Sequence, residues 1–425
     1  MKCKKLLFYL YLVAVPAMAQ TYVLDSIEGK YPFVNWKANT IKMAEYSPAF
    51  KTLFHKMDTI AKGGKTDLHI FHIGGSHIQA DIYSNRLRSY LQTMGPTAKG
   101  QRGFIYPYKI AKTNNPGNYR VEHDGEWQGY RCSVRKDSVA WGLSGVTAVF
   151  KDSLANVKIK ANGNNYHQDM YDFDKIRIFY DDWSTDYEIA FKEAGLVSEI
   201  KENKDAHFIE YKLTKKVEEI DFCIRRVEDH EEAEFLMMGI ELMNDNKGIQ
   251  YTSIGVNGGS FSYYERCEYF DDQLLLYKPD LFIVSVGTND AYHPDFEPQE
   301  YKQQYTNLIK LIQKANPECA VLLTVPNDSY YKKKVPNPRT RIARKMIYEV
   351  AKEQQMAVWD FYEIMGGFNS SRDWYNNKLM PKDRIHFTVK GYRIKADLLL
   401  QALANAWEKE LQVPNNSILN NIINE

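Results

Sequence analysis

Two kinds of hydrophobic pattern alternate along this chain. In its outer parts, short apolar runs are followed by longer segments in which apolar residues recur every three or four positions. The apolar runs are 68–73, 280–286, 320–325 and 357–361, and the helix-like segments are 301–315, 339–355 and 390–411. Buried strands that alternate with helices predict a parallel sheet built from strand–helix–strand units.

The middle of the chain has a different period. Between residues 118 and 243, segments such as 157–160, 175–180 and 187–191 alternate apolar with polar residues, and clusters of Gly, Asn and Asp separate them. A period of two at short spacing, with turn residues between the segments, indicates an antiparallel sandwich. The pattern therefore predicts an α/β domain that is interrupted by an inserted β-sandwich.

The first residues predict export. Three lysines precede the apolar run 6–15, and small residues at the −3 and −1 positions predict cleavage after Ala19. The run is too short for a permanent membrane anchor, which needs about 20 apolar residues. No later segment is long and apolar enough to span a bilayer. We therefore expect a soluble protein that is secreted or periplasmic.

Composition narrows the class of protein. The chain has 425 residues, with 55 Lys and Arg against 54 Asp and Glu, and 44% of its residues are hydrophobic. These values exclude a disordered chain, a collagen-like fibre and a small disulfide scaffold. The formal net charge of +1 gives no electrostatic reason to expect nucleic acid as a partner. The predicted division is a signal peptide at 1–19, a lead-in at 20–66, an α/β domain at 67–117 and 244–413, an inserted sandwich at 118–243 and a loose polar tail at 414–425.

Four cysteines remain after the predicted cleavage, and their pairing is open. They are Cys132, Cys223, Cys267 and Cys319. Their spacing matches no C-x-x-C pair and no zinc-site pattern. An oxidising compartment allows one or two disulfides, but scattered cysteines in a long chain are more often buried thiols. The sequence places no chemistry on them.

Polar residues at predicted strand ends are the candidates for chemistry, because ligands in open α/β sheets collect at the carboxyl ends of the strands. Ser76 follows two glycines after the strand 68–73 and opens a helix, where its hydroxyl is exposed or serves only as an N-cap. Gly258 lies beside a second glycine, which allows a close backbone approach or simply a turn. Asn289 follows the strand 280–286 and either donates its amide to a reacting oxygen or caps the next helix.

The fourth candidate is a pair of residues in a loop before the last helix. Asp383 stands three positions before His386, so its carboxylate can accept a hydrogen bond from the imidazole and fix the tautomer. A histidine held in this way can act as general base to a serine. In isolation, such a pair is more often part of a surface loop. A nucleophile, two oxyanion donors and an Asp-His pair in this order are much more specific together.

This set resembles the four sequence blocks of the SGNH hydrolases, also called the GDSL esterase/lipase superfamily, which carry Ser, Gly, Asn and His. The matching residues are Ser76, Gly258, Asn289, Asp383 and His386, the last two in the family's Asp-x-x-His form. By this resemblance Ser76 is the nucleophile, His386 its base and Asp383 the residue that orients the base. The Ser76 N–H, the Gly258 N–H and the Asn289 side chain form the oxyanion hole. The resemblance also implies a flavodoxin-like three-layer domain, a parallel sheet between helices, and neither a metal nor a cofactor.

One residue departs from the family pattern. The first block usually contains Gly-Asp-Ser, whereas Gly75 takes the place of the aspartate here. The aspartate normally helps to hold the turn and the neighbouring oxyanion hole, so the departure implies a less efficient site. The alternative is that glycine only relaxes the turn, since nucleophile, base and orienting acid are all present.

The long insertion narrows the expected substrate. The stretch 72–79 and the β-rich segment resemble bacterial peptidoglycan O-acetylesterases, which carry a carbohydrate-binding-like sandwich between the first two blocks. Trp127, Trp141 and Trp183 offer rings for stacking on sugars, but aromatic residues in a sandwich are more often core. Three lysines at 332–334 follow a strand and could meet carboxylates of a stem peptide, although a solvated loop is the commoner arrangement.

The function implied by the resemblance is a secreted serine esterase that removes O-acetyl groups from a carbohydrate polymer through an acetyl-enzyme. Its expected partner is an acetylated glycan, from peptidoglycan or another source. Two alternatives stay open: an O-acetyltransferase on the same scaffold, and a catalytically inactive glycan-binding protein. The sequence leaves the glycan, the acyl group and the oligomeric state undetermined.

Overall fold

The computed structural model describes residues 29–44, 47–163, 171–181, 186–227, 233–414 and 417–424. The predicted signal peptide lies outside these residues. None of the helices in the described ranges is long and apolar enough to cross a membrane.

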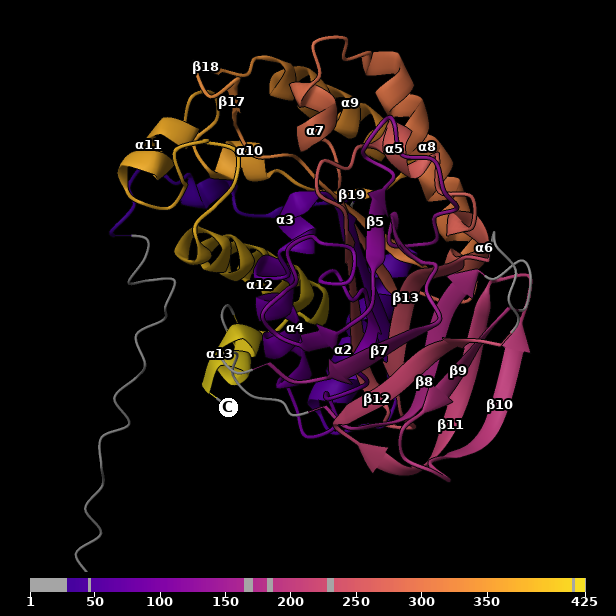
Figure 1. Cartoon of the computed structure of the whole chain (residues 1–425). Coiled ribbons are helices and arrows are strands. Elements are labelled where there is room, and N and C mark those ends of the chain that lie inside the picture. Colours follow the sequence, from indigo (N-terminus) through magenta and orange to yellow (C-terminus); the bar gives the residue numbers. More distant parts are fainter. Residues whose placement is uncertain are drawn as a thin grey trace, which may run out of the picture.

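A six-stranded sheet forms the centre of the α/β part (Figure 1). Its strands are β1 (Ile41–Lys42), β2 (Asp67–Gly74), β14 (Gly248–Gly255), β15 (Leu281–Ser285), β16 (Ala320–Thr324) and β19 (Ala357–Trp359). They lie in the order β1-β19-β16-β15-β2-β14, and every pair is parallel except β1 with β19. Numbered along the chain, the parallel strands have the order 2-1-3-4-5, which is the flavodoxin-like topology. The predicted fold class of this part is confirmed.

Helices cover both faces of the sheet, because its strands are apolar on both sides. The long helices are α2 (Pro48–Ala61), α4 (Tyr83–Gln92), α8 (Pro298–Ala315), α9 (Arg339–Gln354) and α12 (Val389–Leu411). Along β2, Leu68 and Ile70 share a hydrophobic core with α2, α4 and α12. Phe71 and Ile73 share the other core with α8 and α9. This alternation follows from the period of two in a strand, and it produces three layers.

Two segments that the sequence analysis left outside the domain belong to it. The lead-in at 20–66 contributes β1 to the sheet and the helix α2, whose apolar side chains are buried. The tail at 414–425, predicted to be loose, contains α13, in which Leu419 and Ile422 are buried. The remaining short elements are η1 (Trp36–Ala38), α3 (Ser76–Gln79), α5 (Phe261–Tyr264), α6 (Phe270–Leu274), α7 (Thr288–Tyr292), β17 (Tyr330–Tyr331), β18 (Val335–Pro336), α10 (Phe361–Ile364), α11 (Ser371–Asn376) and α13 (Ser417–Asn424).

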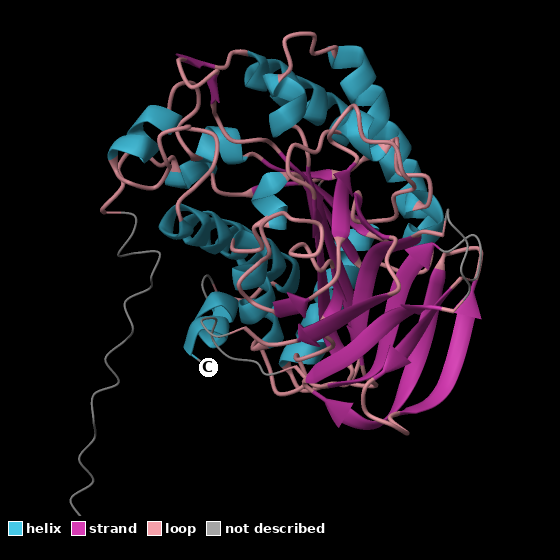
Figure 2. Ribbon diagram, viewed as in Figure 1, coloured by secondary structure: helices cyan, strands magenta, loops and turns pink. Residues whose placement is uncertain are grey.

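The insertion is an antiparallel β-sandwich, as the sequence pattern predicts, and Figure 2 shows its strands beside the α/β part. One sheet has the order β10-β11-β8-β13-β6-β5 with β3 also paired to β13, and the other has the order β4-β7-β12-β9. The strands are β3 (Gly103–Ile105), β4 (Arg120–His123), β5 (Trp127–Arg131), β6 (Val146–Phe150), β7 (Leu154–Lys160), β8 (Phe173–Asp181), β9 (Tyr187–Phe191), β10 (Val197–Asn203), β11 (Phe208–Val217), β12 (Glu219–Arg226) and β13 (Phe235–Met243). Between the sheets, the rings of Phe191 and Tyr211 pack edge to face with centroids 4.8 Å apart. The strand β3 precedes position 118, where the sequence pattern begins the insertion.

Buried polar contacts join the sandwich to the α/β part, in addition to a common apolar core. Glu241 of β13 is 2% exposed and pairs with Arg177 of β8 at 3.0 Å. The same carboxylate accepts hydrogen bonds from Tyr277 at 3.2 Å and from Gln250 of β14 at 3.1 Å. Because a buried carboxylate is costly to leave unpaired, these contacts fix the insertion against the central sheet.

Candidate active site

The ends of three neighbouring strands define the candidate site. The strand β2 lies between β14 and β15, where the strand order reverses. Ligands of open α/β sheets bind at such switch points. The loops after β2, β14 and β15 carry Ser76, Gly258 and Asn289 respectively. In Figure 1 these loops lie at the upper end of the sheet, around α3 and α7.

A tight glycine turn brings Ser76 to the end of β2. A Cβ atom at Gly74 would lie 2.4 Å from the Ile78 side chain and 2.9 Å from the Ser285 carbonyl oxygen. Only glycine therefore allows β2, α3 and β15 to approach this closely. The sequence predicts one helix after Ser76, but the chain forms the four-residue α3 and then breaks at Asp81, whose φ is 44°. The helix α4 begins only after this break.

A continuous hydrogen-bond relay connects three of the predicted site residues. Ser76 Oγ lies 2.9 Å from His386 Nε2, and His386 Nδ1 lies 2.9 Å from Asp383 Oδ2. Ser76 is half-buried, and the side chains of His386 and Asp383 are 40% and 24% exposed. In this geometry the imidazole can accept the hydroxyl proton while the carboxylate stabilises the resulting imidazolium.

The loop around Asp383 favours its ionised form. Burial opposes the charge, but hydrogen bonds from the His386 ring, the Ile385 N–H at 2.8 Å and the His386 N–H at 3.1 Å outweigh it. Together they hold the pKa of Asp383 below its usual value. Arg384 adopts a φ of 52° between the two site residues, so the Asp-x-x-His spacing forms a turn in which the carboxylate meets the ring.

Residues that the sequence analysis did not select hold this turn in place. The Arg384 guanidinium lies over the rings of Tyr330 and Tyr375, at 4.3 and 5.0 Å from their centroids. The Asn327 side chain donates a hydrogen bond to the Ile385 carbonyl oxygen at 3.1 Å. Because these partners come from other segments of the chain, no short motif points to them.

Two further loops reach the residue before Ser76 and present N–H groups there. A Cβ atom at Gly75 would lie 3.0 Å from Asn289 Nδ2 and 3.3 Å from the Gly259 carbonyl oxygen. Asn289 Nδ2 donates to that oxygen at 2.8 Å, which leaves its second N–H for another acceptor. Gly258 has a φ of 81°. Within the described residues, neither its N–H nor that of Ser76 donates to a protein acceptor.

The same proximity gives a physical reason for the glycine at position 75. A Cβ contact of 3.0 Å is tighter than nine in ten such contacts in proteins, so a side chain at Gly75 would press on the Asn289 amide. A side chain at this position therefore requires the Asn289 amide to shift by a few tenths of an ångström. Gly75 is therefore part of how these loops pack around the turn that carries Ser76.

The loop that carries Gly258 is held from two sides. Gln79 of α3 accepts a hydrogen bond from the Asn257 N–H at 2.7 Å. From the insertion, Ser133 Oγ donates to the Asn257 carbonyl oxygen at 2.6 Å. The insertion therefore contributes to the shape of the candidate site, a role that the sequence did not reveal.

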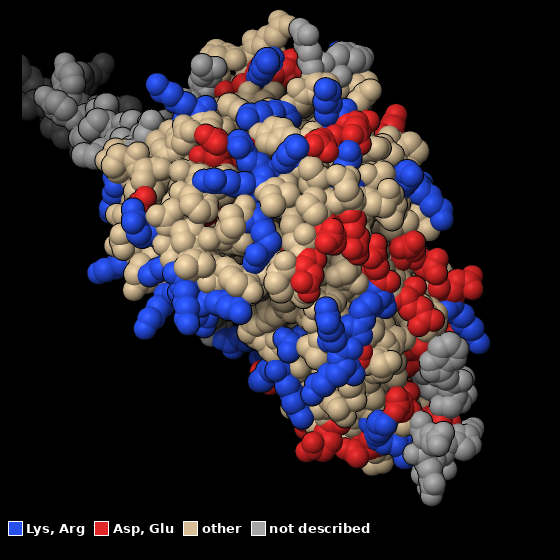
Figure 3. Space-filling view, turned by 90° about the horizontal axis from the view of Figure 1, so that it is seen from above, with Lys and Arg blue, Asp and Glu red and all other residues tan. Residues whose placement is uncertain are grey.

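A cavity of about 860 Å³ opens beside these N–H groups. Gly258 and Asn289 lie in its wall, together with Arg135 from the insertion and Lys332 from the turn between β17 and β18. Other polar residues of the wall include Ser260, Ser262, Tyr263, Tyr292, Asp295, Glu297 and Glu300. Figure 3 looks down on this side of the molecule, where basic and acidic side chains are both spread over the surface. The polar groups of this wall can pair with a hydroxyl-rich ligand.

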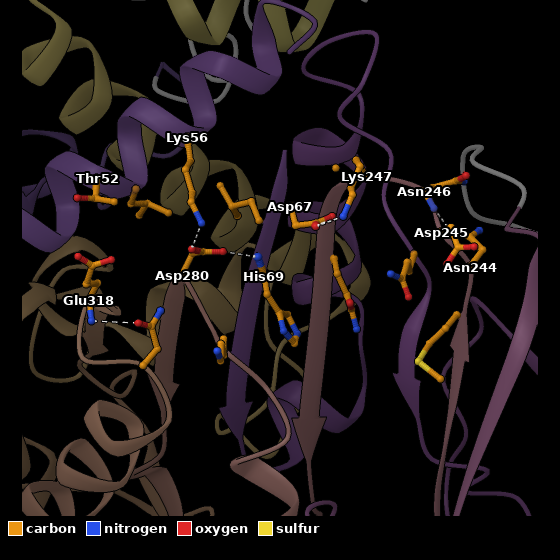
Figure 4. Close-up of a pocket in the computed structure, with 18 of the residues that line it drawn as sticks. Thr52, Lys56, Asp67, His69, Asn244, Asp245, Asn246, Lys247, Asp280 and Glu318 are labelled. Atoms are coloured by element: carbon orange, nitrogen blue, oxygen red, sulfur yellow. Dashed lines mark hydrogen bonds and ion pairs between the residues drawn. The ribbon is translucent and has the colours of Figure 1, made fainter. Parts of the chain in front are cut away.

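A second cavity, of about 530 Å³, lies at the opposite end of the sheet (Figure 4). There Lys56 pairs with Asp280 at 2.6 Å, and Asp280 also accepts the His69 N–H at 2.8 Å. Lys247 pairs with Asp67 at 2.5 Å. None of the predicted site residues lines this cavity. These ion pairs connect the amino-terminal ends of β15 and β2 to the helix α2 and to the residue before β14, respectively.

Residues near the site and the tryptophans of the insertion are largely buried. His77, directly after Ser76, is buried, and its ring centre lies 5.3 Å from that of His386. Trp127 and Trp141 are 1% and 3% exposed, so they belong to the core and do not offer a face to a sugar. Trp183 lies outside the described residues. Among the described residues, no group of His, Cys, Asp and Glu side chains could hold a metal ion.

A comparison of the sequence with models of known protein families finds one matching family. Residues 241–394 match the GDSL-like Lipase/Acylhydrolase family. A solved structure described as a peptidoglycan O-acetylesterase in action superimposes with a TM-score of 0.66 at 20% identity, and the match covers 87% of this chain and 99% of that one. An acetylxylan esterase from Geobacillus stearothermophilus, at 20% identity, gives a TM-score of 0.29 over 38% of this chain and 75% of its own. No curated protein matches the sequence.

The family match runs from β13 into α12 and includes the loops with Gly258, Asn289 and the Asp383–His386 turn, while Ser76 lies before it. The solved structure at 20% identity shows that the fold, with its insertion, is shared over most of the chain. Residues 241–394 are therefore similar to the GDSL-like lipases and acylhydrolases, and the fold of most of the chain is that of the solved structure, which together support a carboxylic ester hydrolase of the SGNH type.

Proposed function

We propose that this chain removes O-acetyl groups from a carbohydrate polymer, with Ser76 as nucleophile, His386 as base and Asp383 as the residue that orients the base. The relay from Ser76 Oγ through His386 to Asp383 carries this proposal. It lies next to unpaired N–H groups, and Gly258 and Asn289, which carry two of them, line an open cavity, a combination suited to acyl transfer to a serine.

In the proposed mechanism, Ser76 Oγ attacks the acetyl carbonyl carbon while His386 Nε2 takes the hydroxyl proton. The Ser76 N–H, the Gly258 N–H and Asn289 Nδ2 donate to the oxyanion, and each donor of this kind contributes about 3–4 kcal/mol. His386 then protonates the departing sugar hydroxyl and leaves an acetyl-enzyme. A water molecule, deprotonated by His386, releases acetate and restores Ser76.

A glycan polymer is the substrate that the surroundings of the relay favour. The cavity is open, its wall combines many polar groups with aromatic rings, and part of it comes from the insertion through Arg135. The solved structure that shares the fold over most of the chain carries a title naming a peptidoglycan O-acetylesterase, which supports O-acetylated peptidoglycan as the first polymer to test. Such a polymer lies outside the cytoplasm, in agreement with the predicted cleavage after Ala19.

Acetate release from O-acetylated peptidoglycan and from acetylated xylan tests the proposal, using protein that begins after Ala19. Ser76→Ala and His386→Ala should each remove nearly all turnover without changing the circular dichroism spectrum, and Asp383→Asn should leave a small remainder. Release by Ser76→Ala at the wild-type rate would overturn the mechanism. Transfer of acetyl to an added acceptor glycan without net hydrolysis would assign a transferase, and binding of the polymer without either reaction would assign a glycan-binding protein.

A further inference from the structure

Two buried thiols meet where the insertion joins the α/β part. Cys132 follows β5 and is 0% exposed, and Cys267 follows α5 and is 6% exposed. A Cβ atom at Gly145 would lie 2.8 Å from Cys132 Sγ and 3.6 Å from Cys267 Sγ, so both sulfurs approach the same point. A hydrogen bond to the Cys132 thiol, followed by burial, raises the pKa of Cys267 well above its usual value, in agreement with this geometry.

The backbones around these thiols are held together by other contacts. Arg266 Nη1 donates to the Cys132 carbonyl oxygen at 2.6 Å, and its guanidinium lies 4.9 Å from the centre of the Trp141 ring. The Cys132 N–H donates to the Gly145 carbonyl oxygen at 2.9 Å. Gly145 has a φ of 65°, and a side chain there would occupy the space of the sulfurs. The packing of these segments therefore places the two cysteines close together.

The other two cysteines of the described chain have different surroundings. Cys223 is half-buried in the middle of β12. Cys319 is 5% exposed, directly before β16, and its thiol donates weakly to the Ala320 carbonyl oxygen at 3.5 Å. Among the described contacts, neither has another thiol as a neighbour. The structure thus selects one pair of the combinations that the sequence allows.

We propose that Cys132 and Cys267 form a disulfide when the chain folds in an oxidising compartment. One cysteine thiolate attacks a disulfide oxidant and forms a mixed disulfide, and the second cysteine displaces the oxidant as a thiol. Two cysteine protons are released, and the oxidant gains the two electrons as its disulfide becomes two thiols. Since both sulfurs are buried in the folded chain, the exchange takes place during folding, while the thiols are still accessible.

This bond would stabilise the loops around the site. Cys132 precedes Ser133, whose hydroxyl donates to Asn257 next to Gly258. Tyr264, which lies beside both thiols, donates its hydroxyl hydrogen bond to the Gly74 carbonyl oxygen at 2.7 Å, two residues before Ser76. The disulfide would close a loop of about 135 residues and join the insertion covalently to the catalytic layer, so it raises the unfolding temperature. This inference does not depend on the substrate.

The test is oxidative refolding of the chain that begins after Ala19, with a mixture of reduced and oxidised glutathione. Free thiols are then counted under denaturing conditions, and proteolytic peptides are mapped by mass spectrometry without reductant. We expect two free thiols, a peptide with Cys132 joined to one with Cys267, and an unfolding temperature that falls by several degrees when the protein is reduced. Cys223→Ser is the matched control and should keep both the bridge and the shift.

The variants Cys132→Ser and Cys267→Ser should each lose the bridge and most of the difference between oxidised and reduced protein. Four free thiols after oxidative refolding, or a bridge that includes Cys223 or Cys319, would overturn the inference. The peptide map of the unmodified sequence decides the question even where a serine variant does not fold.

Discussion

Replacing Asn289 by alanine tests the proposed oxyanion site directly. Asn289 is the second residue of α7, which begins directly after Gly287, whose φ is 134°. A Cβ atom at Gly287 would lie 2.2 Å from the Tyr301 hydroxyl oxygen, so the loop path that places Asn289 requires glycine. Nδ2 of Asn289 then donates to the Gly259 carbonyl oxygen at 2.8 Å and keeps one N–H for another acceptor.

Because the Asn289 amide has two N–H groups, the alanine variant should lose both catalytic rate and folding stability, and the two losses can be measured separately. Without the free N–H, the transition state loses one of three oxyanion donors, worth about 3–4 kcal/mol, so kcat should fall by about 10²–10³. Without the N–H that reaches Gly259, the folded chain loses one hydrogen bond, worth about 1 kcal/mol. KM should change little, because the donor acts on the charge that develops in the transition state.

The assay is the initial rate of acetate release by Asn289→Ala, together with thermal unfolding of the same protein. Asn307→Ala is the matched control, because Asn307 is exposed on α8. Asn289→Asp should fall at least as far as the alanine variant, since it adds a negative charge where the oxyanion forms. If Asn289→Ala keeps kcat within about twofold of wild type while folded, the proposed donor is wrong.

Three other substitutions test the packing at Gly75, the buried charge of Lys395 and the contribution of Arg135 to the cavity wall. Gly75→Ala should lower kcat about tenfold or more at unchanged fold, because its Cβ would press on the Asn289 amide at 3.0 Å; wild-type turnover would show that the amide yields freely. Lys395 is fully buried, and burial lowers its pKa from 10.5 to about 7. The unfolded chain therefore binds a proton in this interval that the folded chain does not, and stability is lost as the pH falls through it. Lys395→Met should raise the unfolding temperature most at pH 7 and below, with a gain that shrinks toward pH 10.5; a gain that grew with pH would contradict this. Arg135 is exposed in the cavity wall, so Arg135→Ala should raise KM for an acetylated polymer and leave kcat on a small acetyl ester unchanged, whereas an equal loss on both esters would place Arg135 in the chemistry.

The sequence by itself determined the local elements and the residue types of the candidate site. Apolar runs with a period of two or of three to four residues reflect which side chains are buried in a strand or a helix, so they reveal elements such as β2 and α12. The spacing of Asp383 and His386 is equally local, because three residues are enough for a turn to bring a carboxylate to a ring. These features could be predicted because the physical cause lies within a few residues of the effect.

Contacts between distant segments were decided only by the tertiary structure. Ser76 reaches His386 from 310 positions away because parallel strands end at the same edge of the sheet. The packing of the insertion against that edge brings Ser133 to the Gly258 loop, where it donates a hydrogen bond. The same packing brings Cys132 close to Cys267. No pattern in the sequence encodes such pairs, since any two surface loops of suitable composition are possible partners until the cores on both sides of the sheet fix their positions.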